Sequence, residues 1–282
     1  MKISVASGKG GTGKTTMSVN LARVFDGKIV LADCDVEEPN AHLFLKTLHE
    51  AQKIVGIPAP AVDESRCDGC GECSKICRFS AIVTFGTAPL AFPEMCHGCG
   101  GCTLVCLPKA ITEKDRRIGV LETSRADHVT LLTGRLDVGV ALAPPLIRAV
   151  RGELPLKGDA ILDAPPGTSC PVIAAVRDTD MVLLVTEPTP FGLNDLTLAV
   201  DMVRALQLPF GVIVNRMGSG DDRVQDYCKK EGIPVLLTIP DDRRIAEAYS
   251  RGMLIVDALP QYRALFEHLW KIIRQRLGEG SS

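Results

Sequence analysis

The sequence predicts an α/β protein with a mostly parallel, doubly wound sheet, into which a small cysteine-rich α+β domain is inserted. Three observations support this. Short apolar segments alternate with segments of helical spacing along most of the 282 residues, and this alternation is typical of a parallel sheet covered on both faces. A glycine-rich loop joins the first apolar segment to the first helical one. Most of the cysteines lie in one stretch, residues 67–106.

Composition limits the classes of function. Hydrophobic residues make up 46% of the chain, enough for a sizeable core, and no apolar run reaches the length of a membrane span. A net charge of −2 and an aromatic content of 4% argue against a nucleic-acid partner. The first strand runs directly into the glycine-rich loop, which leaves no room for a signal peptide. We therefore expect a cytoplasmic protein whose cysteines serve metal or redox chemistry rather than disulfides.

The elements of the predicted sheet follow from apolar periodicity. Strands are expected at 2–6, 28–32, 160–162, 181–186, 210–215 and 235–239, and helices at 16–25, 193–206, 223–230, 243–250 and 261–277. The last helix has an apolar stripe, which is typical of a helix docked on a sheet; an amphipathic membrane helix is the alternative. Residues 1–57 and 117–282 are expected to form the sheet domain, and residues 58–116 the insert.

The loop at residues 8–15 (GKGGTGKT) matches the pattern G-x-x-x-x-G-K-[ST] between a strand and a helix, the context that defines a P-loop. Glycines let successive backbone N–H groups point at phosphate oxygens. The helix N-terminus adds a positive partial charge. In such a loop Lys14 reaches the β- and γ-phosphates, and the Thr15 hydroxyl is a ligand of Mg²⁺. The sheet is therefore expected to be of the P-loop NTPase type.

Lys9 makes this loop resemble the deviant Walker A motif of the MinD, ParA and nitrogenase-iron-protein superfamily. The resemblance implies a homodimeric ATPase in which ATP lies between two subunits and Lys9 contacts the partner's nucleotide. It implies phosphate contacts from the loop residues Gly8, Lys9, Gly10, Gly11, Thr12, Gly13, Lys14, Thr15 and Thr16.

Three further segments match the family in the same order along the chain. In KIVLADCDVEEPN, Asp35 resembles the switch I aspartate that orients the attacking water. In GDAILDAPPGTS, Asp163 resembles the Walker B aspartate that holds Mg²⁺ through water, and Gly167 the γ-phosphate sensor of switch II. Asn215 and the pair Pro240-Asp241 resemble the adenine contacts. The implied catalytic residues are Lys9, Lys14, Asp35 and Asp163. Because no arginine finger can be identified, hydrolysis is expected to be slow and stimulated by a partner.

The insert contains an internal repeat. CDGCGECSKIC begins at Cys67, and CHGCGGCTLVC repeats its spacing 29 residues later; the same shift aligns Ala81-Ile82 with Ala110-Ile111. Two C-x₂-C-x₂-C-x₃-C runs resemble the bacterial two-cluster ferredoxin, in which the fourth cysteine of each run ligates the other [4Fe–4S] cluster. The resemblance implies Cys67, Cys70, Cys73 and Cys106 for cluster I, and Cys96, Cys99, Cys102 and Cys77 for cluster II.

One feature departs from the ferredoxin pattern. Arg78 and Leu107 stand directly after the last cysteine of each run, where ferredoxins have proline. Structural zinc is the competing interpretation, but zinc sites usually pair two C-x₂-C units across a longer gap. The other three cysteines, Cys34, Cys170 and Cys228, are expected to be packed thiols, and His97 a solvated loop histidine.

Three functions fit these features. The first is an ATPase whose dimerisation and switch motions gate electron transfer through two [4Fe–4S] clusters to a redox partner. The second is an ATPase for the assembly of iron–sulfur or other metal cofactors, similar to the Mrp family; those carriers hold a labile cluster through a C-terminal C-x-x-C, and no such pair follows Cys170. The third is a MinD- or ParA-like positioning switch that senses redox state. The expected cofactors are two [4Fe–4S] clusters, Mg²⁺ and ATP or ADP.

Overall fold

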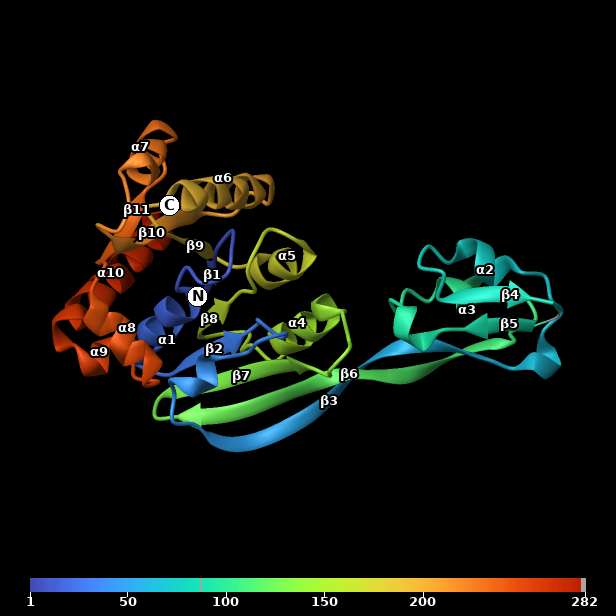
Figure 1. Ribbon diagram of the computed structural model, residues 1–282. Helices are drawn as coiled ribbons and strands as arrows, with labels where there is room; N and C mark the ends of the chain where they lie inside the picture. The colour runs from blue at the N-terminus through green and yellow to red at the C-terminus, as the bar shows by residue number, and fades with distance from the viewer. Residues whose placement is uncertain (87, 280–282) are drawn as a thin grey trace. The chain divides into compact units, whose positions relative to one another are not determined.

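The computed structural model describes residues 1–86 and 88–279, and these divide into two compact units (Figure 1). One unit, called here the sheet unit, comprises Met1–Gln52, Leu121–Arg135 and the chain from Ile147 onward. The other, called the cysteine unit, comprises Lys53–Val120 and Leu136–Leu146. The chain thus passes from the sheet unit into the cysteine unit twice, at Lys53 and again at Leu136, and returns each time.

The central sheet of the described chain has nine strands in the order β11-β10-β9-β1-β8-β2-β7-β6-β3. From β11 to β7 every neighbouring pair is parallel. The connection between β6 and β7 is Asp127-His128, and a link of two residues makes an antiparallel hairpin. The strands are β1 (Lys2–Ala6), β2 (Ile29–Asp33), β3 (Leu48–Val62), β6 (Ile111–Ala126), β7 (Val129–Leu136), β8 (Asp159–Asp163), β9 (Met181–Thr186), β10 (Phe210–Met217) and β11 (Val235–Pro240). The sheet is therefore mostly parallel, as predicted.

Helices cover both faces of this sheet, so the α/β class is also confirmed. Helices α1, α8, α9 and α10 lie on one side of the strands, and α4, α5 and α6 on the other (Figure 1). The helices of the described chain are α1 (Lys14–Val24), α2 (Glu72–Ile76), α3 (Gly101–Val105), α4 (Ala143–Gly152), α5 (Cys170–Val176), α6 (Pro190–Ala205), α7 (Arg223–Lys230), α8 (Arg243–Ser250), α9 (Ile255–Ala258) and α10 (Arg263–Glu279).

The long strand β3 is the main departure from the predicted elements. It runs through Ile57-Pro58-Ala59-Pro60 to Val62, although proline is usually excluded from the interior of a sheet. These prolines are compatible with a strand because β3 lies at the edge of the sheet. A strand at the edge tolerates proline where its missing N–H faces no neighbour. The apolar side chains of Val55, Ile57 and Ala59 alternate with these prolines and are buried.

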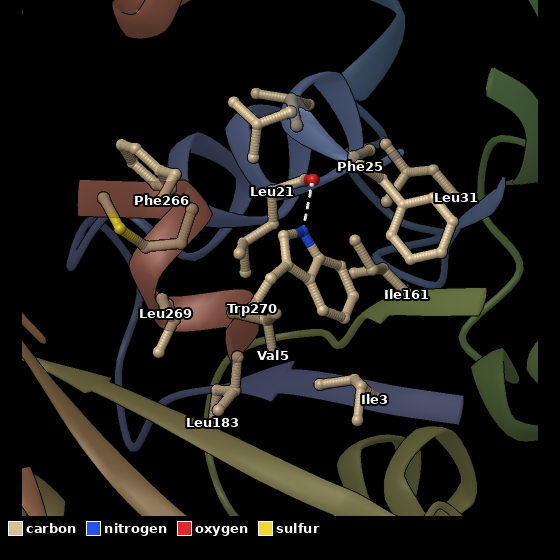
Figure 2. Close-up of a cluster of buried hydrophobic side chains, with 14 of the residues drawn as sticks. Ile3, Val5, Leu21, Phe25, Leu31, Ile161, Leu183, Phe266, Leu269 and Trp270 are labelled. Atoms are coloured by element: carbon tan, nitrogen blue, oxygen red, sulfur yellow. Dashed lines mark hydrogen bonds between the residues drawn. The ribbon is translucent and has the colours of Figure 1, made fainter. Parts of the chain in front are cut away.

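The C-terminal helix α10 packs its apolar stripe into the core of the sheet unit (Figure 2). Phe266, Leu269 and Trp270 recur at helical spacing and are all buried against α1. The Trp270 indole Nε1 donates to the Leu21 carbonyl oxygen at 2.9 Å. Its ring meets the Phe25 ring edge-on, with centroids 5.0 Å apart. The predicted docking of the last helix is thus confirmed, and within the described residues no helix is long and apolar enough to cross a membrane.

In the cysteine unit, the two cysteine runs of the sequence repeat have the same local structure. Each run is preceded by a 3₁₀ turn, Glu64–Arg66 or Pro93–Met95, and leads into a short helix, α2 or α3. Between the runs, β4 (Ile82–Phe85) and β5 (Ala88–Ala91) pair antiparallel. The aligned residues Ile82 and Ile111 are both buried. The insert is therefore an α+β unit with a small core, and the sulfur-bearing residues contribute to that core.

Replacement of Phe266 by alanine should destabilise the sheet unit by about 3–5 kcal/mol, because a fully buried aromatic side chain would leave a cavity between α10 and α1. Urea unfolding followed by the fluorescence of Trp270, the single tryptophan, measures this loss. Leu156→Ala is the control: this side chain is 99% exposed, and its replacement should change stability by less than about 0.5 kcal/mol. Equal stabilities of the two variants would contradict the packing described.

Candidate nucleotide site and cysteine cavities

The glycine-rich loop between β1 and α1 has the backbone conformation that its sequence requires. Gly13 precedes the first residue of α1 and has φ +98°, in the left-handed region that favours glycine. A Cβ atom at Gly13 would also lie 2.5 Å from the Asn215 amide nitrogen. That nitrogen donates to the Thr12 carbonyl oxygen at 2.9 Å. Asn215 on β10 therefore braces the loop from the neighbouring part of the sheet.

A cavity of about 400 Å³ opens beside this loop. It brings together ten of the predicted nucleotide residues: Gly10, Gly11, Gly13, Lys14, Thr15, Thr16, Asp35, Asn215, Pro240 and Asp241. Its wall also contains residues to which the sequence assigned no role: Glu38, Asn40, Pro166, Arg216, Asp242, Ile245, Ala246 and Tyr249. The loop end of the cavity offers an N-terminal helix end and a lysine, whereas the far end offers apolar side chains of α8. The cavity thus has a phosphate-binding end and an end suited to a nucleoside.

The other predicted residues of the site lie outside the cavity wall. Gly8 packs directly on the backbone of α6, where a side chain would overlap the Asp195 carbonyl. The Thr12 hydroxyl is buried and has no hydrogen-bond partner in the described part of the chain. Gly167 has φ +96°, and its N–H donates to the Ser7 carbonyl oxygen at 3.0 Å, next to the loop. These residues shape the loop in this conformation rather than line its pocket.

Two aspartates from adjacent strands lie side by side beneath the loop. The parallel register of β2 and β8 places Asp33 opposite Asp163, and both are buried. Burial raises the pKa of Asp163 to about 6, while the charge of Lys14 and hydrogen bonds from Thr15 and Ser18 oppose the shift. Burial and the charge of Asp163 likewise raise the pKa of Asp33. This part of the site is therefore built to receive positive charge.

Each oxygen of Asp163 has a distinct environment. Oδ1 accepts a hydrogen bond from the Ser18 hydroxyl at 3.0 Å, whereas Oδ2 is buried without a partner among the described residues. A buried carboxylate oxygen without a partner is costly unless a ligand or ion satisfies it. Carboxylate and hydroxyl oxygens are the donors that Mg²⁺ prefers. Asp163 and Thr15 therefore fit the magnesium site expected from the sequence.

Asp33 received no role in the sequence analysis, but it organises the loop that carries Asp35. Its Oδ2 accepts from the backbone N–H groups of Asn40 at 2.9 Å and Ala41 at 3.0 Å. Its Oδ1 accepts from the Asp35 N–H at 3.2 Å. Its position at the last residue of β2 is the one signal in the sequence that could have identified it. Asp35 itself lines the cavity, and burial raises its pKa.

Lys9 does not point into the cavity of its own chain. Its Nζ lies 3.7 Å from Oε2 of Glu187, and Arg216 donates to the other oxygen of Glu187 at 2.6 Å. The Glu187 side chain is only 10% exposed. Glu187 therefore holds Lys9 at the rim of the site, and no motif in the sequence pointed to this carboxylate.

The eight cysteines of the insert line two cavities. Cys77, Cys96, Cys99 and Cys102 line one of them, called here the Cys96 cavity. Cys67, Cys70, Cys73 and Cys106 line the other, called the Cys67 cavity. Each set contains three cysteines of one run and the fourth cysteine of the other. Both quartets are thus the ones that the ferredoxin resemblance implies, and four thiol donors around one cavity fit a [4Fe–4S] cluster.

Backbone N–H groups surround the sulfur atoms. Ala81 donates to Cys77 Sγ at 3.2 Å, and the equivalent Ala110 donates to Cys106 Sγ at 3.2 Å. Burial would raise the pKa of Cys77, but hydrogen bonds from Phe79 and the following N–H groups hold that pKa below its usual value. Such donors stabilise the thiolate, which is the form that binds metal. Within the described residues, no group of three or more His, Cys, Asp or Glu side chains is placed to hold a single metal ion.

The cysteines outside the insert differ in exposure. Cys34 and Cys228 are buried, and burial raises the pKa of both thiols, that of Cys228 to about 11. The expectation of packed thiols is correct for these two and wrong for Cys170, which is exposed at the first position of α5. His97 is exposed as expected, and it also stacks on Phe79 with ring centroids 3.6 Å apart.

The buried aspartate pair predicts a pH dependence of stability. The folded state holds a proton on Asp163 up to about pH 6, whereas an unfolded aspartate loses it near pH ~3.9. The raised pKa therefore makes the nucleotide-free protein less stable as pH rises between these values. Asp163→Asn cannot ionise, so its melting temperature should fall less than that of the wild type between about pH 4 and pH 6. Asp26→Asn, at an exposed position, is the matched control; parallel curves for all three proteins would contradict the shift.

The crossed arrangement of cysteines predicts which cavity loses a sulfur atom when one cysteine is replaced. Cys77→Ser removes a sulfur from the Cys96 cavity, although Cys77 belongs to the first run. The double variant Cys77→Ser/Cys99→Ser should damage one cluster only, because both residues line the Cys96 cavity. The double variant Cys77→Ser/Cys70→Ser should damage both, because Cys70 lines the Cys67 cavity. Iron analysis and electron paramagnetic resonance (EPR) of the reduced protein, purified without oxygen, measure this. Cys170→Ser is the control and should keep the full iron content. Loss of both clusters in Cys77→Ser/Cys99→Ser would contradict the assignment.

Comparison with known proteins agrees with this fold. Residues 3–255 match the CobQ/CobB/MinD/ParA nucleotide binding domain. An uncharacterized protein of Methanocaldococcus jannaschii is 31% identical over 89% of this chain and 90% of its own length. An iron-sulfur cluster carrier protein of Pyrococcus horikoshii is 26% identical over 97% of this chain and 86% of its own. The crystal structure of the Pyrococcus furiosus cell division ATPase MinD superposes with a TM-score of 0.61 and 25% identity, covering 97% of this chain and 98% of that one. The match to the family extends over most of the chain, and the phosphate loop, the buried aspartates and the nucleotide-sized cavity lie within it. The chain therefore belongs to the CobQ/CobB/MinD/ParA nucleotide-binding family and is an ATPase of the MinD/ParA type.

Proposed function

We propose that this ATPase uses nucleotide-dependent dimerisation and switch motions to control electron transfer through two [4Fe–4S] clusters to a redox partner protein. The observation that carries the proposal is the pair of cavities, each lined by four cysteines drawn from both runs. They occur in one chain with a P-loop ATPase site. The ATPase domain is taken as residues 1–57 and 117–282, and the cluster domain as 58–116.

The nucleotide site supplies the first half of this function. Lys14 and the loop N–H groups hold the phosphates, Thr15 and Asp163 hold Mg²⁺, and Asn215 with Pro240-Asp241 receives the adenine. Asp35 has a raised pKa and lines the cavity, so it can orient the attacking water and accept its proton. Hydrolysis is slow without a partner, because no arginine finger can be identified in the sequence and Lys9, which lies 3.7 Å from Glu187, acts on the nucleotide of the partner subunit.

The cysteine unit supplies the second half. A [4Fe–4S] cluster takes up and releases single electrons at low potential. Cys67, Cys70, Cys73 and Cys106 hold one cluster, and Cys96, Cys99, Cys102 and Cys77 the other. The N–H groups of Ala81 and Ala110 stabilise the sulfur of the fourth ligand in each set. Burial of Cys73 and Cys96 excludes water from one side of each cavity.

The chain connectivity supports coupling between the two halves. The loop that carries Asp35 leads through a 3₁₀ turn directly into β3, and β3 is continuous from the sheet unit into the cysteine unit. Strand β6 returns in the same way and is followed, through β7 and α4, by the strand that ends at Asp163. A movement of switch I on hydrolysis is therefore transmitted to the cysteine unit through the continuous backbone of β3 and β6, as in other nucleotide switches.

A second candidate is a carrier that delivers iron–sulfur clusters to other proteins. The observation in its favour is the similarity, over 97% of this chain, to the iron-sulfur cluster carrier protein of Pyrococcus horikoshii. Against it stands the closed arrangement of eight cysteines in two quartets, which suits clusters that stay bound. Transfer of iron and sulfide from the loaded protein to an apo-ferredoxin would favour this candidate.

The test of the first proposal is a redox titration of the loaded protein without nucleotide, with ADP and with ATP. We expect EPR signals of two reduced clusters and reduction potentials that differ between the ADP and ATP states. Colourless protein that contains zinc would exclude the clusters. Potentials and electron-transfer rates that are independent of nucleotide would exclude the gating.

Lys9→Ala should abolish ATP-dependent dimerisation, because the proposed contact with the partner's nucleotide requires its ammonium group. Sedimentation velocity with ATP and with ADP measures the monomer–dimer equilibrium. Lys28→Ala, at an exposed position on the same unit, is the matched control and should dimerise as the wild type does. A Lys9→Ala protein that still dimerises with ATP would show that this lysine does not bridge the subunits.

A further inference from the structure

The two cysteine cavities share a backbone but differ in the charges around them. Arg116 on β6 contacts the backbone of Cys96, a residue that lines the Cys96 cavity: its Nη2 donates to the Cys96 carbonyl oxygen at 3.1 Å. Its Nε is buried and has no hydrogen-bond partner in the described part of the chain. No carboxylate among the described residues forms a salt bridge with Arg116. The guanidinium therefore places a partly buried, uncompensated positive charge beside one cavity.

The neighbouring residue, Arg117, has a different environment. Arg117 is exposed, and both oxygens of Asp137 accept hydrogen bonds from it, at 2.8 and 2.9 Å. Its charge is therefore neutralised within the chain and screened by solvent. Arg116 and Arg117 differ in surroundings and not in chemistry, so they form a matched pair for experiment.

Close backbone packing fixes the position of Arg116. At Gly56 of β3 a Cβ atom would lie 3.2 Å from the Arg116 carbonyl oxygen, so the two strands approach tightly there. Gly98 has φ +67°, and a Cβ atom on it would lie 3.2 Å from the Pro58 carbonyl oxygen. The loop that begins at Cys96 is thus held on β3. The Cys96 carbonyl and the Arg116 side chain meet because both are anchored to the same strand.

The Cys67 cavity has the opposite surroundings. Two acidic residues line it: Asp68, whose Oδ1 accepts from the Cys70 N–H at 3.1 Å, and Glu72, which pairs with Lys75 at 2.6 Å. Pro108 also lines this cavity, and its carbonyl oxygen accepts a hydrogen bond from the exposed Arg66 at 3.3 Å. The Cys96 cavity contains one acidic residue, the exposed Glu113.

These charges act directly on the uptake of an electron. Reduction adds one negative charge to a cluster, so a nearby positive charge raises its reduction potential and a nearby carboxylate lowers it. A partly buried charge is screened less than an exposed one. Arg116 therefore favours reduction in the Cys96 cavity, and Asp68 opposes it in the Cys67 cavity.

We propose that Arg116 sets the order of reduction, so that the cluster of the Cys96 cavity accepts an electron before the cluster of the Cys67 cavity. This inference rests on the proposed function in requiring that both cavities hold [4Fe–4S] clusters. The step is the transfer of one electron to each cluster from an external low-potential reductant. Arg116 acts through its charge and the Cys96 carbonyl and is not a ligand.

The test is an anaerobic redox titration of the full-length loaded protein with dithionite, followed by EPR. The wild type should show two one-electron waves. Arg116→Gln should lower the reduction potential of the upper wave by about 59 mV, which for one electron is a factor of about ten in the equilibrium constant. The potential of the lower wave should not change. Arg117→Gln should leave both waves in place. Asp68→Asn should raise only the lower wave.

Arg116→Lys keeps a positive charge and should give an upper wave between those of the wild type and Arg116→Gln. The inference is overturned if Arg116→Gln shifts the potential of the lower wave, or of neither wave. It is also overturned if Arg117→Gln shifts the upper wave as much as Arg116→Gln does, or if Arg116→Lys and Arg116→Gln have the same upper potential. Two waves that do not respond to Arg116 refute this inference alone. Wild-type protein without EPR signals of reduced [4Fe–4S] clusters refutes the proposed function itself.

Discussion

The parallel pairing of β2 and β8 is the constraint on which the nucleotide site depends. It places Asp33 and Asp163 opposite each other at the carboxyl end of the sheet, both buried. Two buried carboxyl groups at one point are tolerable only with hydrogen-bond donors and positive charge around them. Lys14, the Ser18 hydroxyl and the N–H groups of the Asp35 loop meet this need. The first turn of α1 and the loop after β2 are therefore both organised by this one juxtaposition.

The same constraint affects ion binding. Desolvation lowers the pKa of Lys14, and the nearby charges of Asp163 and Asp35 act against that shift. One oxygen of Asp163 is left without a partner among the described residues. A site with a surplus of buried acceptors is prepared for Mg²⁺ and a nucleotide, whose binding would satisfy them. Stability and ligand affinity are thus opposed at this position, as is common at functional sites.

The cysteine unit illustrates how a repeat gains asymmetry. Its two halves share the cysteine spacing, the 3₁₀ turn and the short helix, because the same residues recur at the same intervals. They differ where they meet β3 and β6, which are not part of the repeat. Among the described residues, the second half receives a half-buried arginine from those strands and the first half does not. A duplicated scaffold can therefore provide two equivalent sets of ligands with different electrostatic surroundings.

Much of this architecture could be read from local patterns. Strand β1, strand β9 and helices α7 and α8 occur with the predicted bounds, because apolar periodicity and turn residues act over short distances. The edge strand β3 could not be predicted from its own residues, since its prolines are acceptable only because no strand pairs with its outer side. The hairpin of β6 and β7 was also not predicted.

The sequence by itself determined the family, the phosphate loop and the two cysteine quartets, since each depends on residue types at fixed spacing. The tertiary structure alone decided which charges meet. Asp33 faces Asp163 across 130 residues of chain, Glu187 holds Lys9, and Arg116 rather than Arg117 lies against Cys96. Spacing cannot encode such contacts, because they arise where strands distant in sequence pack together and exclude water.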